Sequence, residues 1–466
     1  MKTLLWFVSF FSLIAVLPVN AELNLELPDL NLPDLGAQSR SYAGTLKEQH
    51  SGLKILRKLR RSNKIIEDPE LSVWIRSIGH KLASNAPRSS SSFFFVIAKN
   101  PSINAFATPG GVVVINSGLI LHSKTESELA AVIAHEIAHV TQNHIARMIS
   151  KSKSNQLAAG AAVLAGVLAS SKDPQAGQAI ISASMAGMAH QQLSFSREAE
   201  AEADRVGLRI LARAGFNPVG MPNFLNRLEQ FADNRSANMT EYLRSHPLTL
   251  KRVSDTRIRA KQFGNYRGRE NISYLYMREK LRALTNARTP IPANLPANIK
   301  KYSRALQLKQ RGNYQAALRL TGNSSHNLSE AILIAQLLNK QRKYQQTIRI
   351  LEPLIKIYPG DEVLSIPLAQ AYVAKGQALK GWKVLNEVNI SEQTSLEYFE
   401  ALQETARLAR KNSQAYRAVA NRNIRTGNYK AAALQLRRAI KQTDASEHEL
   451  LDLQKQLTLL KAFTSK

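Results

Sequence analysis

The pattern of apolar and polar positions separates an apolar N-terminal run, a mixed middle part and a long helical C-terminal part. The N-terminal run extends from Leu4 to Leu17, is broken only by serines and ends at Pro18. Residues 126–150 and about 194–214 carry helical patterns, whereas Ser92 to Ile97 is a β-type run. The pattern predicts a mostly helical α+β chain with a small sheet.

A second pair of strands is predicted after the β-type run. Residues 104–108 lead into Pro109-Gly110-Gly111, and Val112 to Ile115 follows. Glycine supplies the backbone freedom that a tight turn between strands requires. We therefore expect a hairpin here.

The C-terminal part repeats. Gly312-Asn313-Tyr314, Arg342-Lys343-Tyr344, Gly376-Gln377-Ala378 and Gly427-Asn428-Tyr429 each open a helical pattern. The first three openings are spaced by 30 and 34 residues, and the last gap of 51 residues is near one and a half repeats. This spacing is typical of tetratricopeptide helix pairs. An unrelated helical bundle is the alternative.

Composition and charge narrow the classes of function. The 466 residues include no Cys, so thiolate metal sites, disulfides and a Cys nucleophile are excluded, and a metal must be held by His, Asp or Glu. The net charge of +28 suits nucleic acid, an anionic membrane surface or an acidic partner, with a merely solvated surface as the alternative. The basic residues of the C-terminal part are spread along helical patterns without a dense run, which disfavours nucleic acid.

The N-terminal run has the layout of a secretory signal peptide. Lys2 precedes it, and Val19-Asn20-Ala21 follows as a small-x-small cleavage site. We expect cleavage after Ala21, with an uncleaved anchor as the alternative. Export from a Gram-negative cytoplasm would place the mature protein in the periplasm.

One motif carries catalytic chemistry. His135-Glu136-Ile137-Ala138-His139 contains His-Glu-x-x-His, and positions four apart share one face of a helix. Both imidazoles can then reach one zinc ion, whose bound water has a pKa of about 7, and Glu136 can take the proton of that water. Two helix histidines without a metal are the alternative.

A third ligand is needed. The metzincin pattern requires Gly and His where this chain has Gln142 and Ile145, so that class is excluded. A glutamate from a later helix is the other solution. Glu200 is placed to bind the metal, and Asp204, one turn on, to accept a hydrogen bond from a ligand histidine. A solvated acidic helix is the alternative.

These motifs together resemble a known family. His135-Glu136-Ile137-Ala138-His139 followed by Glu200-Ala201-Glu202-Ala203-Asp204 is similar to the HtpX and CAAX-prenyl-protease type of zinc metallopeptidase. Residues 104–107, Pro109-Gly110-Gly111 and Ser245-His246-Pro247-Leu248 resemble its flanking motifs. The resemblance implies a gluzincin-type fold in which one Zn²⁺ per chain is held by two His and one Glu.

The family pattern implies a role for each matching residue. His135, His139 and Glu200 would be zinc ligands, and Glu136 the general base. His246 would stabilise the oxyanion or act as a fourth ligand that keeps the enzyme latent, with an N-capping or structural histidine as the alternative. Arg252 is a candidate for pairing with a site carboxylate or a substrate carbonyl.

Two other histidines and one segment receive weaker interpretations. We expect His144 to be a helix-surface residue, and we assign no role to His190. Leu157 to Ser184 is rich in Ala and Gly and is expected to pack as a small-residue helix, with a movable lid as the alternative.

An edge strand beside the metal would bind an extended peptide through backbone hydrogen bonds. An ordinary core hairpin is the alternative. The expected substrate-binding residues are Gly110, Gly111, Val112, Val113 and Val114.

The predicted organisation is a signal peptide (1–21), a zinc metallopeptidase domain (22–290) and a tetratricopeptide-repeat domain (297–466). The resemblance extends to exported, repeat-containing members of the family. It implies degradation of misfolded or stalled outer-membrane β-barrel proteins and a chaperone-like role in their assembly. It also implies the barrel-assembly machinery and the lipopolysaccharide-transport barrel protein as partners. A latent metallopeptidase acting as an adaptor is the rival hypothesis, and a basic binder of membrane surfaces or peptidoglycan is a third.

Overall fold

The computed structural model describes a defined part of the chain. The described residues are 42–87, 92–108, 110–144, 147, 196–233, 240–264, 266, 268, 271–322, 325 and 327–464. The predicted signal peptide, His190 and the segment Leu157 to Ser184 lie outside them. Among the described helices, none has the length and apolar character that crossing a membrane requires.

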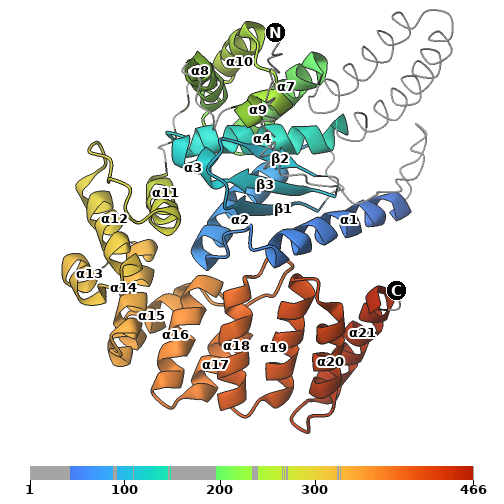
Figure 1. Ribbon diagram of the computed structural model, residues 1–466, viewed down its shortest axis with the longest axis vertical. Coiled ribbons are helices and arrows are strands. Elements are labelled where there is room, and N and C mark those ends of the chain that lie inside the picture. The colour runs from blue at the N-terminus through green and yellow to red at the C-terminus, as the bar shows by residue number, and fades with distance from the viewer. Residues whose placement is uncertain are drawn as a thin grey trace, which may run out of the picture. The chain divides into compact units, whose positions relative to one another are not determined.

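A three-stranded sheet lies among the helices of the first half (Figure 1). The strands are β1 (Phe94–Ala98), β2 (Ala105–Ala107) and β3 (Val112–Asn116). The order is β1-β3-β2, with β3 parallel to β1 and antiparallel to β2. The predicted hairpin of β2 and β3 is therefore confirmed. Its turn includes Gly111 at φ 79°, where an added Cβ would also lie 2.3 Å from the carbonyl oxygen of Ser92.

The central place of β3 corrects one prediction. We expected Gly110 to Val114 to form an edge strand, but β3 has a partner strand on each side and all five of its residues are buried. The continuous Val-Val-Val-Ile run fits this place, because a strand covered on both faces needs apolar side chains at every position. The outer edges of the sheet belong to β1 and β2.

Helix α4 is the central helix of the first half. It contacts α2, α7, α8, β2 and β3. The helices of this half are α1 (Tyr42–Arg61), α2 (Pro69–Ala83), α3 (Ser117–His122), α4 (Glu126–Thr141), α7 (Arg197–Arg213), α8 (Gly220–Asp233), α9 (Thr240–Ser245), α10 (Leu250–Gln262) and α11 (Ile272–Thr285).

Local chemistry fixes where α4 and α7 begin and how closely they pack. The side chain of Thr125 accepts a hydrogen bond from Glu128 N at the start of α4, and that of Ser196 accepts one from Ala199 N at the start of α7. Gly207 lets α7 approach α4, because a Cβ there would lie 3.2 Å from the backbone N of His135. The close approach brings acidic residues of α7 beside the histidines of α4.

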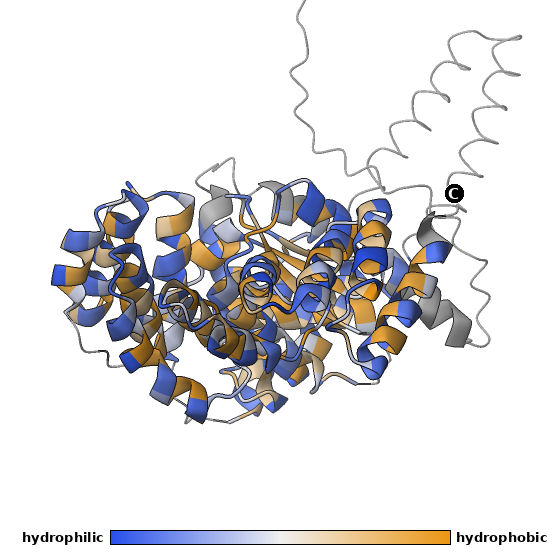
Figure 2. Cartoon of the chain, turned by 90° about the horizontal axis from the view of Figure 1, so that it is seen from below, coloured by the Kyte–Doolittle hydropathy of each residue, from blue (hydrophilic) through white to orange (hydrophobic). Residues whose placement is uncertain are grey.

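The second half is helical throughout its described residues. Consecutive helices pack against each other, as expected for stacked helix pairs. They are α12 (Ala297–Gln310), α13 (Tyr314–Thr321), α14 (Leu328–Lys340), α15 (Tyr344–Ile357), α16 (Glu362–Ala374), α17 (Ala378–Asn386), α18 (Leu396–Leu408), α19 (Asn412–Arg425), α20 (Tyr429–Ile440) and α21 (Glu447–Thr464). Figure 2 shows hydrophobic residues concentrated on the sides of the elements that face their neighbours.

The irregular repeat spacing has a structural cause. Gly312 and Gly376 have positive φ and lie in the turns between α12 and α13 and between α16 and α17. Gly427 lies in the same kind of turn, between α19 and α20. Three helices, α17 to α19, lie between Gly376 and Gly427, whereas two, α15 and α16, lie between Arg342 and Gly376, so the longer gap holds one additional helix.

Candidate active site

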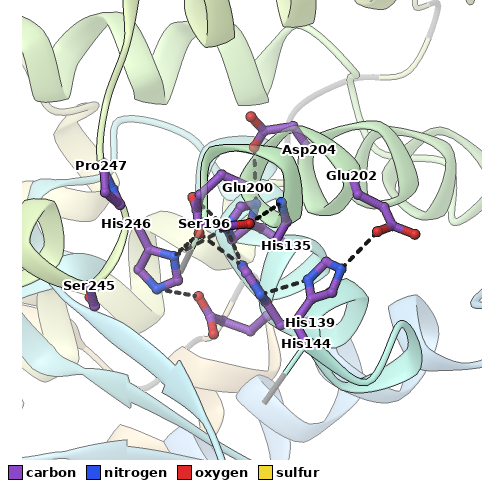
Figure 3. A network of polar contacts seen from close by, with 12 residues as sticks. His135, His139, His144, Ser196, Glu200, Glu202, Asp204, Ser245, His246 and Pro247 are labelled. Atoms are coloured by element: carbon purple, nitrogen blue, oxygen red, sulfur yellow. Dashed lines mark hydrogen bonds and ion pairs between the residues drawn. The ribbon is translucent and has the colours of Figure 1, made fainter. Parts of the chain in front are cut away.

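Four side chains from three parts of the chain converge at one buried point. His135 and His139 lie one turn apart on α4, Glu200 comes from α7, and His246 follows α9 (Figure 3). Each offers one nitrogen or oxygen, and these four atoms lie within 4.8 Å of one another. The structure thus brings the three predicted ligands together and adds His246 to them.

The separations within the cluster are short. Nε2 of His135 lies 2.9 Å from Nε2 of His139 and 3.5 Å from Oε2 of Glu200, and His139 Nε2 lies 3.3 Å from Glu200 Oε1. Burial, followed by the neighbouring His135, lowers the pKa of His139 well below its usual value. The neutral imidazole that results is the form that binds a metal.

Glu136 is anchored beside the cluster by the sheet. Its Oε2 accepts a hydrogen bond from the backbone N of Ala107 in β2, at 3.1 Å. Its other oxygen, Oε1, is buried and makes no hydrogen bond. Burial raises the pKa of Glu136. A pKa nearer to neutral pH suits a group that must both accept and donate a proton.

Asp204 and Arg252 support the cluster from behind. Asp204 Oδ1 lies 3.0 Å from Nδ1 of His135, so this nitrogen is held on the side away from the cluster. Nε and Nη2 of Arg252 donate to the two oxygens of Asp204 at 2.7 and 2.9 Å. Arg252 Nη1 also lies 2.6 Å from Glu200 Oε2. Arg252 thus pairs with carboxylates of the site, one of the two alternatives predicted for it.

These contacts set the charges of the supporting groups. Although burial opposes the charged form of His135, its hydrogen bonds to Asp204 and Glu200 outweigh that effect and raise the pKa of its imidazole. Burial also opposes ionisation of Asp204, but Arg252 lowers the pKa of the carboxyl below its usual value. A buried aspartate is therefore kept ionised by a two-point guanidinium contact.

His246 lies inside the cluster and does not cap a helix. Its Nδ1 is 2.9 Å from Glu200 Oε1 and 3.4 Å from His135 Nε2. The ring of Tyr242 stacks on it with centroids 4.7 Å apart. The N-cap of the following helix, α10, is Thr249, so the N-capping alternative for His246 is wrong.

His144 is a site residue that sequence reasoning missed. We expected it on a helix surface, but it is buried, and its Nδ1 lies 3.0 Å from Nδ1 of His139. Its Nε2 lies 3.1 Å from Oε2 of Glu202, which also contacts Arg147. The signal that could have revealed it is Asn143, which precedes it and has φ 58°. Asn tolerates this left-handed backbone better than other residues with a side chain.

Two histidines from one helix, a glutamate from a second helix and the carboxylate of Glu136 beside them define a metallopeptidase site of the His-Glu-x-x-His class. The model of peptidase family M48 matches residues 69–260, which include all of these groups. The chain belongs to peptidase family M48 and is a zinc metalloendopeptidase.

Relatives extend the similarity into the helical second half. The β-barrel assembly-enhancing protease of Escherichia coli (strain K12) is 32% identical over 377 residues, which cover 78% of this chain and 77% of the relative. The protein with the same name from Yersinia pestis is 33% identical over 373 residues, covering 76% of each chain. The mitochondrial metalloendopeptidase OMA1 of Arabidopsis thaliana is 32% identical over 157 residues, covering 34% of this chain and 29% of the relative.

Proposed function

We propose that this chain is an exported, zinc-dependent endopeptidase that degrades misfolded or stalled outer-membrane β-barrel proteins and assists their assembly. The observation that carries the proposal is the buried cluster of His135, His139 and Glu200 with Glu136 beside it. The class of client is taken from the two β-barrel assembly-enhancing proteases, which match over three quarters of their length.

The chemistry of the cluster fits one zinc ion. Two imidazoles and a carboxylate are a common set of zinc ligands, and ligand bonds of about 2.0–2.1 Å place neighbouring ligand atoms of a tetrahedron roughly 3.3 Å apart. The separations of 2.9 to 3.5 Å between the ligand atoms support this fit. We propose His135, His139 and Glu200 as the ligands. When bound, zinc supplies a Lewis acid and a nucleophile at neutral pH.

Glu136 would act as the general base and then as the general acid. Its Oε2 is held by Ala107 N, while Oε1, which makes no hydrogen bond and lies 3.5 Å from His246 Nε2, would accept the proton of an attacking water. The same carboxyl group then delivers that proton to the leaving amine. The hydrogen bond from β2 holds this carboxyl group in place beside the cluster.

The substrate would pair with β2. The outer edge of β1 is already used, because Phe95 N donates to Oε1 of Gln393. In the ladder of β2 and β3, Thr108 N donates to Val112 O and Asn116 N donates to Asn104 O. Because hydrogen-bonding sides alternate along a strand, the backbone groups of Ala105 and Ala107 face away from β3. The N–H of Ala107 already donates to Glu136, so the substrate would pair with the N–H and C=O of Ala105 and the C=O of Ala107. Phe106 and Ala107 are half-buried and lie at the end nearest Glu136.

His246 would regulate the site as a fourth ligand. Its Nδ1 lies as close to Glu200 Oε1 as the two α4 histidines lie to each other, at 2.9 Å. This position supports the latent form of the enzyme more than oxyanion stabilisation by a free imidazole. It also favours the rival function, a closed metallopeptidase that acts mainly as an adaptor.

Residues 1–21 would be a signal peptide removed on export to the periplasm, 22–290 the peptidase domain and 297–466 a tetratricopeptide-repeat domain. The repeats would recruit clients, the barrel-assembly machinery and the lipopolysaccharide-transport barrel protein. The similarity to the assembly-enhancing proteases beyond residue 260 supports this use of the second half.

A cleavage assay tests the proposal. Residues 22–466 are purified, their zinc content is measured, and an unfolded outer-membrane β-barrel protein is offered as substrate. Glu136→Gln should keep zinc and lose about 10²–10⁴-fold in cleavage rate, whereas His246→Ala should cut faster than wild type. Zinc-loaded protein that cuts nothing, with His246→Ala equally inert, would support the adaptor. Absence of zinc would reject the metal assignment.

A further inference from the structure

The two α4 histidines are supported in different ways. Nδ1 of His135 faces Asp204, a buried carboxylate that Arg252 keeps ionised. Nδ1 of His139 lies 3.0 Å from Nδ1 of another imidazole, that of His144. The buried imidazole of His144 is in turn 3.1 Å from the carboxylate of Glu202, which is partly exposed (Figure 3).

A short left-handed turn makes this contact possible. In a continuous helix, a residue five positions after His139 points about 140° away from it. Here α4 ends at Thr141, and Asn143 adopts φ 58°. The chain turns back at this residue, so the ring of His144 packs edge-on against the ring of His139, with centroids 4.8 Å apart.

The hydrogen bonds allow one arrangement of protons when His139 presents Nε2 as a bare ligand atom. Nδ1 of His139 then carries the proton and donates to Nδ1 of His144. His144 consequently carries its own proton on Nε2 and donates it to Glu202, whose carboxylate only accepts. The line His139–His144–Glu202 thus selects the ring tautomer and orientation that a metal ligand requires.

We propose that His144 and Glu202 are positioning residues that hold His139 for metal binding, with Asn143 supplying the turn that brings His144 into place. The proposal rests on the proposed function, because it takes His139 as a zinc ligand. Both residues would act through His139. They would hold His139 in the tautomer and orientation for zinc binding before the metal is bound.

Zinc affinity measured by competition with a chromophoric chelator tests the proposal directly. His144→Leu should weaken zinc binding by about 10–100-fold, the usual cost of losing such an outer contact. His144→Gln should recover most of the loss, because its amide can accept from His139 and donate to Glu202 at the same time. A residue that only filled space would be replaced as well by Leu as by Gln.

Glu202→Ala provides a second variant that does not depend on a buried substitution, since the Glu202 side chain is 38% exposed. It should also weaken zinc binding, whereas Arg209→Ala, an exposed change on the same helix, should not. If folded His144→Leu and Glu202→Ala proteins bound zinc as tightly as wild type, the positioning role would be rejected and the proposed function would stand. A wild-type protein without zinc would instead overturn the proposed function, and the positioning role with it.

Discussion

The backbone N of Phe95 donates a hydrogen bond of 2.9 Å to Oε1 of Gln393, a residue 298 positions further along the chain. Gln393 lies between α17 and α18, and its Nε2 lies 3.1 Å from Nε2 of His80. The next residue back, Glu392, contacts Arg57 and Arg60 of α1. One short segment of the helical second half is therefore fixed to the outer strand of the peptidase sheet.

Removing that amide should destabilise the protein. Gln393→Ala leaves the buried N–H of Phe95 without an acceptor, and we expect the free energy of unfolding to fall by about 1–3 kcal/mol. Urea denaturation measures the change. Gln403→Ala, on the exposed side of α18, is the matched control and should be nearly neutral. Equal stability of the two variants would contradict this account of the contact.

Gly207 should resist even the smallest substitution. Ala normally stabilises a helix relative to Gly by about 1 kcal/mol, but a Cβ here lies 3.2 Å from His135 N and Cα and 3.1 Å from Met221 Cε. We expect Gly207→Ala to be destabilising and to weaken zinc binding, because α7 carries Glu200 and must move away from α4. Thermal unfolding and zinc competition report both effects. Ala212→Gly, on the same helix, is the control and measures the difference in helix propensity between Ala and Gly.

Arg252 should not be replaceable by lysine. Its guanidinium bonds both oxygens of Asp204 and also reaches Glu200, a geometry that a single ammonium group does not reproduce. Because loss of one partner leaves a buried carboxylate uncompensated, we expect Arg252→Met to cost about 3–5 kcal/mol of stability. Arg252→Lys should lose a large part of the stability that Arg252 contributes. Chemical denaturation decides, with the exposed Arg257→Lys on α10 as control.

The turn at Asn143 gives a prediction about backbone conformation. Glycine adopts a φ of 58° without strain, so Asn143→Gly should keep both stability and zinc affinity. A β-branched residue at this φ is strained, and Asn143→Val should lose about 1–2 kcal/mol of stability and part of the zinc affinity. If Val bound zinc as tightly as Gly, the turn would have no role in placing His144.

Because of Lys309, the free energy of unfolding should change with pH in the alkaline range. Its Nζ donates to Gln336 Oε1, and burial, followed by the nearby Lys280, lowers its pKa from 10.5 to about 8. Asp68, Glu70 and Glu397 act in the opposite direction without cancelling the shift. Between these two pKa values the unfolded chain binds more protons, so the free energy of unfolding contributed by Lys309 rises with pH.

Replacing this lysine should therefore be stabilising at neutral pH. We expect Lys309→Met to unfold at higher urea concentration than wild type near pH 7, and to lose that advantage as the pH approaches 10.5. Lys301→Met, an exposed change on α12, is the control. An advantage that stayed constant across this pH range would show that the charge of Lys309 costs nothing.

The metal-binding part of the site could be predicted because its geometry is local. Helical spacing alone places His135 and His139 on one face of α4, and the spacing of Glu200 and Asp204 places both on the face of α7 that meets it. The hairpin was predictable for the same reason, since the glycines at its turn are adjacent in the sequence.

Other features depend on contacts that local patterns do not encode. The parallel pairing of β1 with β3, which makes β3 the central strand, joins segments through a crossover and leaves no signature in either strand alone. His144 reaches His139 only because Asn143 leaves the helical conformation. Arg252 pairs with Asp204 across 48 residues, and its two-point geometry emerges only in the folded chain.

The hydrogen bond from Phe95 to Gln393 makes the small sheet a connection between the helical second half and the active site. β1 is held by the helical half at one edge, β3 joins β1 to β2, and β2 ends in the amide of Ala107 that holds Glu136. Only the three hydrogen-bonded strands of this sheet lie between Gln393 of the second half and Glu136, the carboxylate proposed to transfer the proton. The α17–α18 segment and the carboxylate of Glu136 are thus connected through a single hydrogen-bonded sheet.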